Sequence, residues 1–229
     1  MTPVRAVLFD VDFTLAKPGP ELGPEGYARI GARHGLTLDR SRFDEARDAA
    51  IALLERHPDF DHDDEIWYAF TEQIVLGMGG TQPASYACAV EITKGWELHE
   101  NFELYEDVLP VLDELRRAGL KLGLVTNSSR DVRAFAKHHA LDVDATIGSL
   151  EHGKAKPHAS IFAALLELLD VEPADAAMVG DTIADDIEGA HALGMRAILV
   201  DRHGRHPGFK PRLEDLYGLP AALGLPRSP

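Results

Sequence analysis

The feature that most constrains the fold is a regular alternation of helical and strand patterns between residues 107 and 201. Amphipathic segments typical of helices alternate there with short apolar runs typical of buried strands. Helices are predicted over residues 108–118, 129–139, 158–169 and 183–193, and strands over 120–125, 145–147, 176–179 and 197–200. Strands that alternate with helices form a parallel sheet through right-handed crossovers. The sequence therefore predicts an α/β fold built on a Rossmann-like parallel sheet.

A further strand is predicted near the start of the chain, where the apolar run Val7–Phe9 leads directly into Asp10 and Asp12. Ligands of parallel sheets bind beyond the carboxyl ends of the strands. Two carboxylates held at that edge repel each other and are costly to desolvate, and a divalent cation would offset that cost. The alternative is a strand that ends in a solvated acidic turn.

Between these two regions the sequence contains helical patterns only, with helices predicted over residues 25–34, 39–57, 63–76 and 83–96. At 229 residues, the chain is long enough for one core carrying an insertion. We expect an α/β core at 1–16 and 102–229, and an inserted all-helical domain at 17–101. Hinges are expected near Lys17–Pro20 and Leu98–Glu103, and a loosely packed tail after Asp201.

The formal net charge of −15 makes nucleic acid and anionic membranes unexpected partners. Cys88 is the only cysteine, which excludes an intrachain disulfide and suits a reducing compartment. The sequence lacks both a signal-peptide pattern and an apolar run of membrane-spanning length. We therefore expect a cytoplasmic protein. It could be a monomer or a homodimer, since an exposed face of the helical insertion could pair two chains.

Four polar clusters follow predicted strands or precede a predicted helix, and together they resemble the motifs of the haloacid dehalogenase-like (HAD) hydrolase superfamily. The first motif, DxDx[TV], corresponds to residues 10–14, and the second to Thr126 in Val-Thr-Asn-Ser-Ser. The third is Lys156, and the fourth, GDxxxxD, runs from Gly180 to Asp186. The resemblance extends from Val4 to about Asp201. The helical insertion resembles the C1-type cap of the superfamily's subclass I, which would close over the sheet edge, exclude water and supply specificity contacts.

The resemblance implies a Mg²⁺-dependent phosphatase that acts on a small phosphorylated metabolite through an aspartyl-phosphate. Asp10 would be both nucleophile and metal ligand. Asp12 would offer its backbone carbonyl to the metal and its side chain as general acid and base. Asp181 would complete the protein's share of the metal ligands. Asp186 would orient metal-bound water or Lys156, although a shorter GDxxxD spacing would select Asp185 instead.

The phosphate would bind to the Thr126 hydroxyl, to the Asn127 N–H at a strand-to-helix opening, and to Lys156. For residues 126–129 the alternative is simple N-capping of the next helix, and for Lys156 it is a solvated loop lysine. Phe13 departs from the family pattern, which most often has Gly there. Because Phe resists the positive φ that Gly adopts freely, the sequence does not determine the shape of the pocket mouth, and Phe13 could itself contact the substrate.

Asp12 also separates two reactions of the superfamily. A dehalogenase needs no acid at that position because halide leaves without a proton, whereas a phosphatase must protonate its leaving alkoxide. Phosphoryl chemistry is therefore favoured over a haloacid dehalogenase. A phosphomutase, a non-catalytic phosphate-binding protein and a receiver-like phospho-accepting switch remain as alternatives. The receiver is disfavoured because such domains are shorter and lack a cap.

Overall fold

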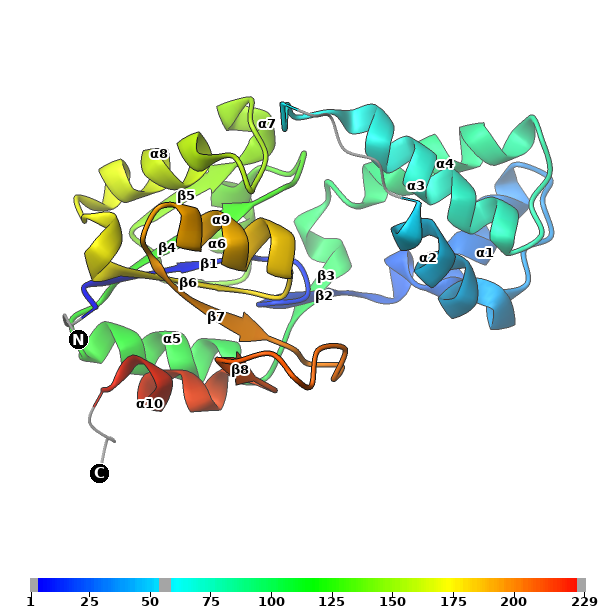
Figure 1. Cartoon of the computed structure of the whole chain (residues 1–229). Coiled ribbons are helices and arrows are strands. Elements are labelled where there is room, and N and C mark those ends of the chain that lie inside the picture. The colour runs from blue at the N-terminus through cyan, green and yellow to red at the C-terminus, as the bar shows by residue number, and fades with distance from the viewer. Residues whose placement is uncertain (1–3, 54–58, 226–229) are drawn as a thin grey trace. The chain divides into compact units, whose positions relative to one another are not determined.

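The computed structural model of the protein describes residues 4–53 and 59–225. The chain divides into two compact units, which we call the core unit and the helical unit (Figure 1). The core unit comprises Met1–Lys17 and Leu104–Pro229, and the helical unit comprises Pro18–Glu103. The chain leaves the core unit after its first strand and returns to it before the second predicted strand of the sheet.

The core unit is built on a six-stranded sheet with the order β5-β4-β1-β6-β7-β8, in which every neighbouring pair is parallel. This confirms the predicted α/β fold with a parallel sheet. Because β1 lies between β4 and β6, the residues that follow these three strands meet at the middle of one edge. The strands are β1 Ala6–Phe9, β4 Lys121–Thr126, β5 Ala145–Gly148, β6 Ala176–Gly180, β7 Arg196–Val200 and β8 Arg212–Leu213.

Helices cover both faces of this sheet (Figure 1). On one face, α8 (Ala159–Leu169) and α9 (Gly189–Ala192) bury alternate strand residues such as Leu8 and Met178 against Phe162 and Leu165. Helices α5 (Val108–Arg117) and α10 (Leu219–Leu223) pack against each other on the opposite face. Two shorter helices, α6 (Val132–His138) and α7 (Ser149–His152), lie beside β5. Burial on both faces accounts for the continuous apolar runs of the strands.

The expectation of a loosely packed tail after Asp201 is wrong. Residues Arg212–Leu213 form β8 at the edge of the sheet, and Leu216, Leu219 and Leu223 are buried. The polar segment before β8 hides this outcome in the sequence, because the strand itself is too short to produce an alternating pattern.

The helical unit contains α1 (Pro24–Arg33), α2 (Phe43–Ala52), α3 (Asp64–Gly77) and α4 (Ala84–Gly95). Their apolar faces meet in a core that includes the buried residues Tyr27, Ile74, Met78, Cys88 and Ile92. The predicted second helix extends to His57, but residues 54–58 lie outside the described part of the chain. Strands β2 (Ala16–Pro18) and β3 (Phe102–Leu104) pair with each other, and neither was predicted because each has only three residues.

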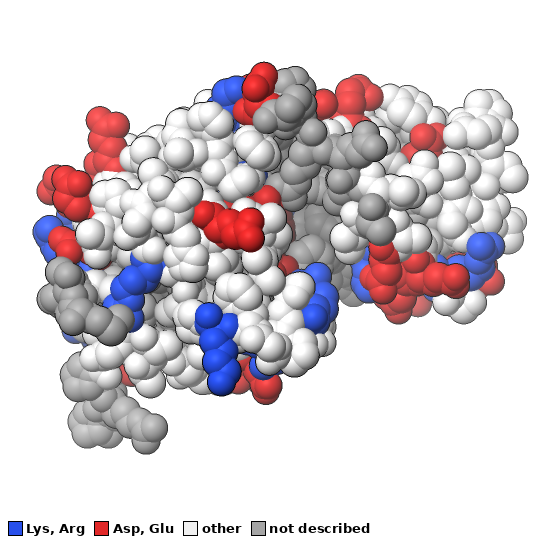
Figure 2. All heavy atoms as spheres, in the orientation of Figure 1, with Lys and Arg blue, Asp and Glu red and all other residues white. Residues whose placement is uncertain are grey.

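On the face shown in Figure 2, acidic and basic side chains are interspersed over the surface. Within residues 4–53 and 59–225, no helix has both the length and the apolar character needed to cross a membrane.

Candidate active site

The candidate site lies where the central strands of the core sheet end. Asp10 directly follows β1, Thr126 ends the neighbouring β4, and Asp181 directly follows β6 on the other side. Asp186 reaches the same point from the π-helical segment Ile183–Glu188, which follows β6. Gly180 makes that approach possible, because a Cβ at this position would lie 2.2 Å from Oδ2 of Asp186.

Lys156 joins two of these acids. Its Nζ donates to Oδ1 of Asp10 and to Oδ1 of Asp186, each at 2.6 Å, and its side chain is 2% exposed. Burial alone would lower the pKa of Lys156, but the charges of Asp10 and Asp186 together raise it above its usual range. The ammonium is therefore charged at neutral pH. A solvated loop lysine, the alternative for this position, is wrong.

Asp10, Asp181 and Asp186 can each bring one carboxylate oxygen within 4.8 Å of the others. Burial raises the pKa of Asp10 well above its ordinary value; Lys156 opposes this, whereas Asp186 and Asp181 add to it. Burial, followed by repulsion from Asp186, raises the pKa of Asp181 to about 6. Three crowded carboxylates disfavour ionisation of one another, and a hard divalent cation with oxygen ligands relieves that repulsion. The donor set fits Mg²⁺.

The structure distinguishes the two candidate acids of the fourth motif by their contacts. Oδ2 of Asp186 accepts from the Thr182 N–H at 3.0 Å, while its Oδ1 faces Lys156. Asp185 points to a different neighbour, since its Oδ2 lies 3.4 Å from Nδ2 of Asn127. Asp186, rather than its neighbour, thus joins the acidic cluster.

Asn127 positions the lysine. Its side-chain Oδ1 accepts from the Lys156 N–H at 2.7 Å, and its Nδ2 donates to the Lys156 carbonyl at 3.0 Å. The expected helix opening at Asn127 is wrong, because α6 begins only at Val132 and Asp131 caps it by accepting from Ala134 N–H at 2.9 Å. For the same reason residues 126–129 do not serve as that helix's N-cap. The Thr126 side chain is buried at the end of β4.

The Asp12 carboxylate is held by Arg130, which was not among the predicted site residues. Nη2 of Arg130 lies 2.7 Å from both oxygens of Asp12, and the guanidinium also stacks over the Phe135 ring, 4.9 Å from its centroid. Arg130 is buried and lies in the loop that directly follows Thr126, the last residue of β4. Its position four residues after Thr126 is the one sequence signal that could have suggested it.

The loop after Asp12 is unusual in its backbone. Phe13 adopts a φ of 63°, a left-handed conformation that is strained for an aromatic residue, and its N–H donates to Ala16 at 2.6 Å. Arg202 fixes the next residue by donating from Nη2 to the Thr14 carbonyl at 2.8 Å, while its Nη1 binds Oδ2 of Asp107 at 2.9 Å. The chain thus adopts at Phe13 the φ that the family's usual Gly would favour.

A second arginine of the segment after β7 reaches the acidic cluster itself. Nη2 of Arg205 donates to Oδ2 of Asp181 at 2.9 Å. This contact was not expected from the sequence either, since the segment after Asp201 was predicted to be a loosely packed tail.

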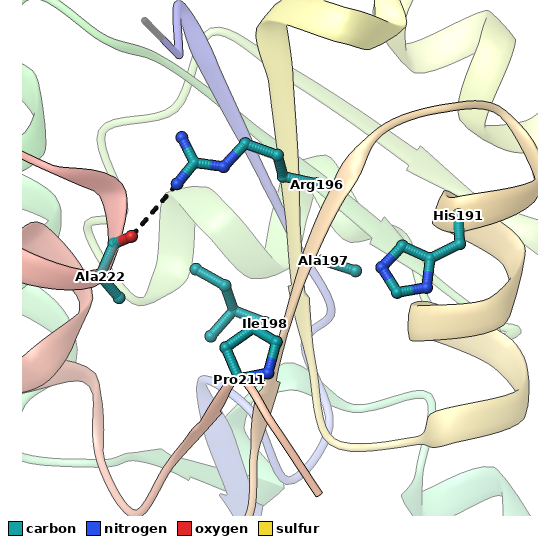
Figure 3. Close-up of a pocket in the computed structure, with 6 residues that line it drawn as sticks. All are labelled: His191, Arg196, Ala197, Ile198, Pro211 and Ala222. Atoms are coloured by element: carbon teal, nitrogen blue, oxygen red, sulfur yellow. Dashed lines mark hydrogen bonds between the residues drawn. The ribbon is translucent and has the colours of Figure 1, made fainter. Parts of the chain in front are cut away.

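A pocket elsewhere on the core unit has no part in this cluster. It lies around the first residues of β7, at the opposite end of the strand from the acids, and Arg196 there donates to the Ala222 carbonyl at 3.2 Å (Figure 3). The residues that line it are His191, Arg196, Ala197, Ile198, Pro211 and Ala222.

Several known proteins resemble this chain in sequence and in structure. The sequence model of the haloacid dehalogenase-like hydrolases matches residues 4–194. Glyceraldehyde 3-phosphate phosphatase of Methanopyrus kandleri is 28% identical over 233 residues, which cover 93% of this chain and 90% of the relative. Ribulose-1,5-bisphosphate 5-phosphatase of Halopiger xanaduensis is 29% identical and covers 86% and 84% of the two chains. The crystal structure of a HAD phosphatase from Thermococcus onnurineus matches with a TM-score of 0.67 at 29% identity, covering 98% of this chain and all of that one (100%).

Proposed function

The chain belongs to the haloacid dehalogenase-like hydrolase family and is a phosphoric monoester hydrolase, and on this premise we propose that it hydrolyses a small phosphorylated metabolite through a phosphorylated Asp10 with the help of Mg²⁺. The observation that carries the proposal is the 2.6 Å contact between Lys156 and Asp10 inside the acidic cluster. An anionic nucleophile can approach an anionic phosphate only where cations neutralise both partners.

Asp10 is the nucleophile of this proposal. One of its oxygens attacks the phosphorus and displaces the ester oxygen, which splits hydrolysis into a transfer step and a water step. The lysine keeps the carboxylate in place, and both side chains of the pair are buried. Mg²⁺ held by Asp10, Asp181 and Asp186 would shield the negative charge between the carboxylate and the phosphate.

Asp12 is the proton-transfer residue. It gives a proton to the leaving oxygen in the first step and accepts one from water in the second. Nη2 of Arg130 donates to both of its oxygens, each at 2.7 Å, and so holds the carboxylate in one orientation. An Asp12 oxygen must be free to reach the leaving group, so this contact has to loosen in the first step, and a phosphate ester in the site would supply a competing anion.

The Thr126 hydroxyl and the backbone around Asn127 are proposed to bind the phosphate, since both lie at the end of β4 beside Asp10. The relatives act on phosphorylated small molecules, according to their names. Phosphorylated three- to five-carbon compounds are therefore the first substrates to test.

The Asp10→Asn variant tests the nucleophile. We expect phosphate release to fall by about a thousandfold or more, while circular dichroism stays native. In the parent enzyme, acid quenching during turnover should trap one phosphoryl group on the peptide that contains Asp10, which mass spectrometry would detect. Near-normal turnover of the variant would contradict the assignment. Transfer to a second sugar position without release of inorganic phosphate would indicate a phosphomutase instead.

A further inference from the structure

The contact between Arg205 and Asp181 places a second cation beside one of the proposed metal ligands. Nη2 of Arg205 lies 2.9 Å from Oδ2 of Asp181, and the side chain of the arginine is 48% exposed against 10% for the aspartate. The other oxygen of Asp181, Oδ1, accepts from the Thr182 hydroxyl at 3.3 Å. Both carboxylate oxygens of Asp181 therefore have protein partners.

The backbone that carries Arg205 is firmly anchored. The Asp201 side chain is buried, and its two oxygens accept from the N–H groups of Arg205 and His206, each at 2.8 Å. Nε of Arg212 donates to the same carboxylate at 2.8 Å. The Cα of Arg205 is thus fixed, whereas its half-exposed side chain can rotate away into water without a change in the loop.

A guanidinium and a divalent cation cannot bind one carboxylate without repelling each other. We propose that Arg205 is a displaceable counter-cation of Asp181: its guanidinium neutralises the carboxylate until Mg²⁺ binds, and it must leave Asp181 for the metal to bind. The inference rests on the proposed metal site but concerns a residue outside the four family motifs. It predicts that Arg205 weakens Mg²⁺ binding and stabilises the protein in EDTA.

The contrast with Lys156 supports this assignment. The Lys156 side chain is buried and bridges two carboxylates, so its ammonium cannot turn away into water. Among the described residues, the Arg205 side chain has one ion pair, in which the arginine is half-exposed and the aspartate largely buried. With one partner in solvent, such a pair contributes on the order of 1 kcal/mol. A metal ion can break it at little cost.

Calorimetric titration of the purified protein with Mg²⁺ tests the proposal without any substrate. We compare the parent with Arg205→Gln, with Arg205→Lys, and with the control Arg133→Gln, which removes the same charge from an exposed position on α6. Arg205→Gln should bind Mg²⁺ about three- to fivefold more tightly, since the lost ion pair is worth up to about 1 kcal/mol. Arg205→Lys should lie between it and the parent, and the control should match the parent.

Thermal unfolding provides a second readout. In EDTA, Arg205→Gln should melt below the parent, and on addition of Mg²⁺ its melting temperature should rise by more than that of the parent. A purely structural role would lower the stability under both conditions and leave Mg²⁺ affinity unchanged or weaker, which would overturn the proposal. If the parent binds Mg²⁺ but has no phosphatase activity, the proposed function fails while this inference stands. If the parent binds no Mg²⁺, both fail.

Discussion

Replacement of Lys156 by Met tests the electrostatics of the whole site, because it removes the buried cation and retains most of the side-chain volume. The substitution leaves Asp10 and Asp186 without the ammonium that contacts both at 2.6 Å. Breaking a buried ion pair by removal of one partner costs about 3–5 kcal/mol. We expect the lower end, about 3 kcal/mol, because Asp10 can take up a proton. For a chain of this length the melting temperature should fall by about 6–12 °C.

The assay is thermal unfolding of the parent and the variant at pH 7.5, in EDTA and in excess Mg²⁺. In EDTA the variant should show the full loss. Mg²⁺ should restore a larger share of stability to the variant than it adds to the parent, since the cluster then carries one more negative charge. A ligand at one hundred times its dissociation constant adds about 2.7 kcal/mol. Phosphatase activity should remain low even when stability is restored.

The gap between the two proteins should also depend on pH. Without the lysine, the pKa of Asp10 rises further above its unfolded value, so that its carboxyl stabilises the fold at low pH and loses that contribution as the pH rises. The gap should therefore narrow as the pH falls toward 5. Lys137→Met, at an exposed position of α6, is the control and should change little. Equal stability of parent and Lys156→Met in EDTA at pH 7.5 would refute the reasoning.

Two further substitutions probe the other acids. Because the pKa of Asp181 is raised to about 6, its ionisation destabilises the fold as the pH rises from about 4 through 6. In EDTA above pH 7, the free energy of unfolding of Asp181→Asn should therefore exceed that of the parent by about 2–3 kcal/mol, and the difference should vanish near pH 4. Urea unfolding at several pH values would measure it. If Asp181→Asn were less stable than the parent at pH 7.5, burial and repulsion from Asp186 would not destabilise the ionised carboxylate of Asp181. Asp186→Asn should reduce phosphatase activity at least about a hundredfold in steady-state kinetics, whereas Asp185→Asn should reduce it less than about tenfold. The reverse order would assign the second acid of the fourth motif to Asp185.

The position of the acidic cluster could be predicted from the sequence because it follows from topology alone. Residues that follow parallel strands collect at one edge, and β1 is the central strand between β4 and β6. Once the alternation of helices and strands was recognised, Asp10 and Asp181 could be expected at the same edge of the sheet. Their direct adjacency depends on the strand order, which the structure supplies. The same rule places Thr126 beside them.

The choice between Asp185 and Asp186 could not be made in the same way. It depends on which side chain of the segment Ile183–Glu188 turns toward Lys156, and this segment is π-helical, with more residues in a turn than an α-helix. A count based on α-helical periodicity is therefore offset there. Motif spacing favoured Asp186, but only the structure shows its contact with the lysine.

The arginine contacts were beyond reach for a different reason. Arg130 meets Asp12 across 118 positions of sequence, and Arg202 meets the Thr14 carbonyl across 188. No periodic pattern encodes such pairings, and the segment that carries Arg202 and Arg205 has the composition of a surface loop. This segment is held in place by the buried side chain of Asp201, which accepts from the N–H groups of Arg205 and His206. Asp201 directly follows the strand predicted over residues 197–200.

The balance of charges in the site explains why the cation of Lys156 is fixed whereas that of Arg205 can be displaced. When Asp10, Asp181 and Asp186 are all ionised, they carry three negative charges. The positive charge of Lys156 neutralises one of them, and a divalent cation would neutralise the other two. Arg205 is then one positive charge too many once Mg²⁺ binds, and it is the cation with an exposed side chain. A buried arginine in its place would compete with the metal permanently, whereas no cation at all would leave a pair of unbalanced carboxylates in the resting protein. The half-exposed position of Arg205 satisfies both requirements.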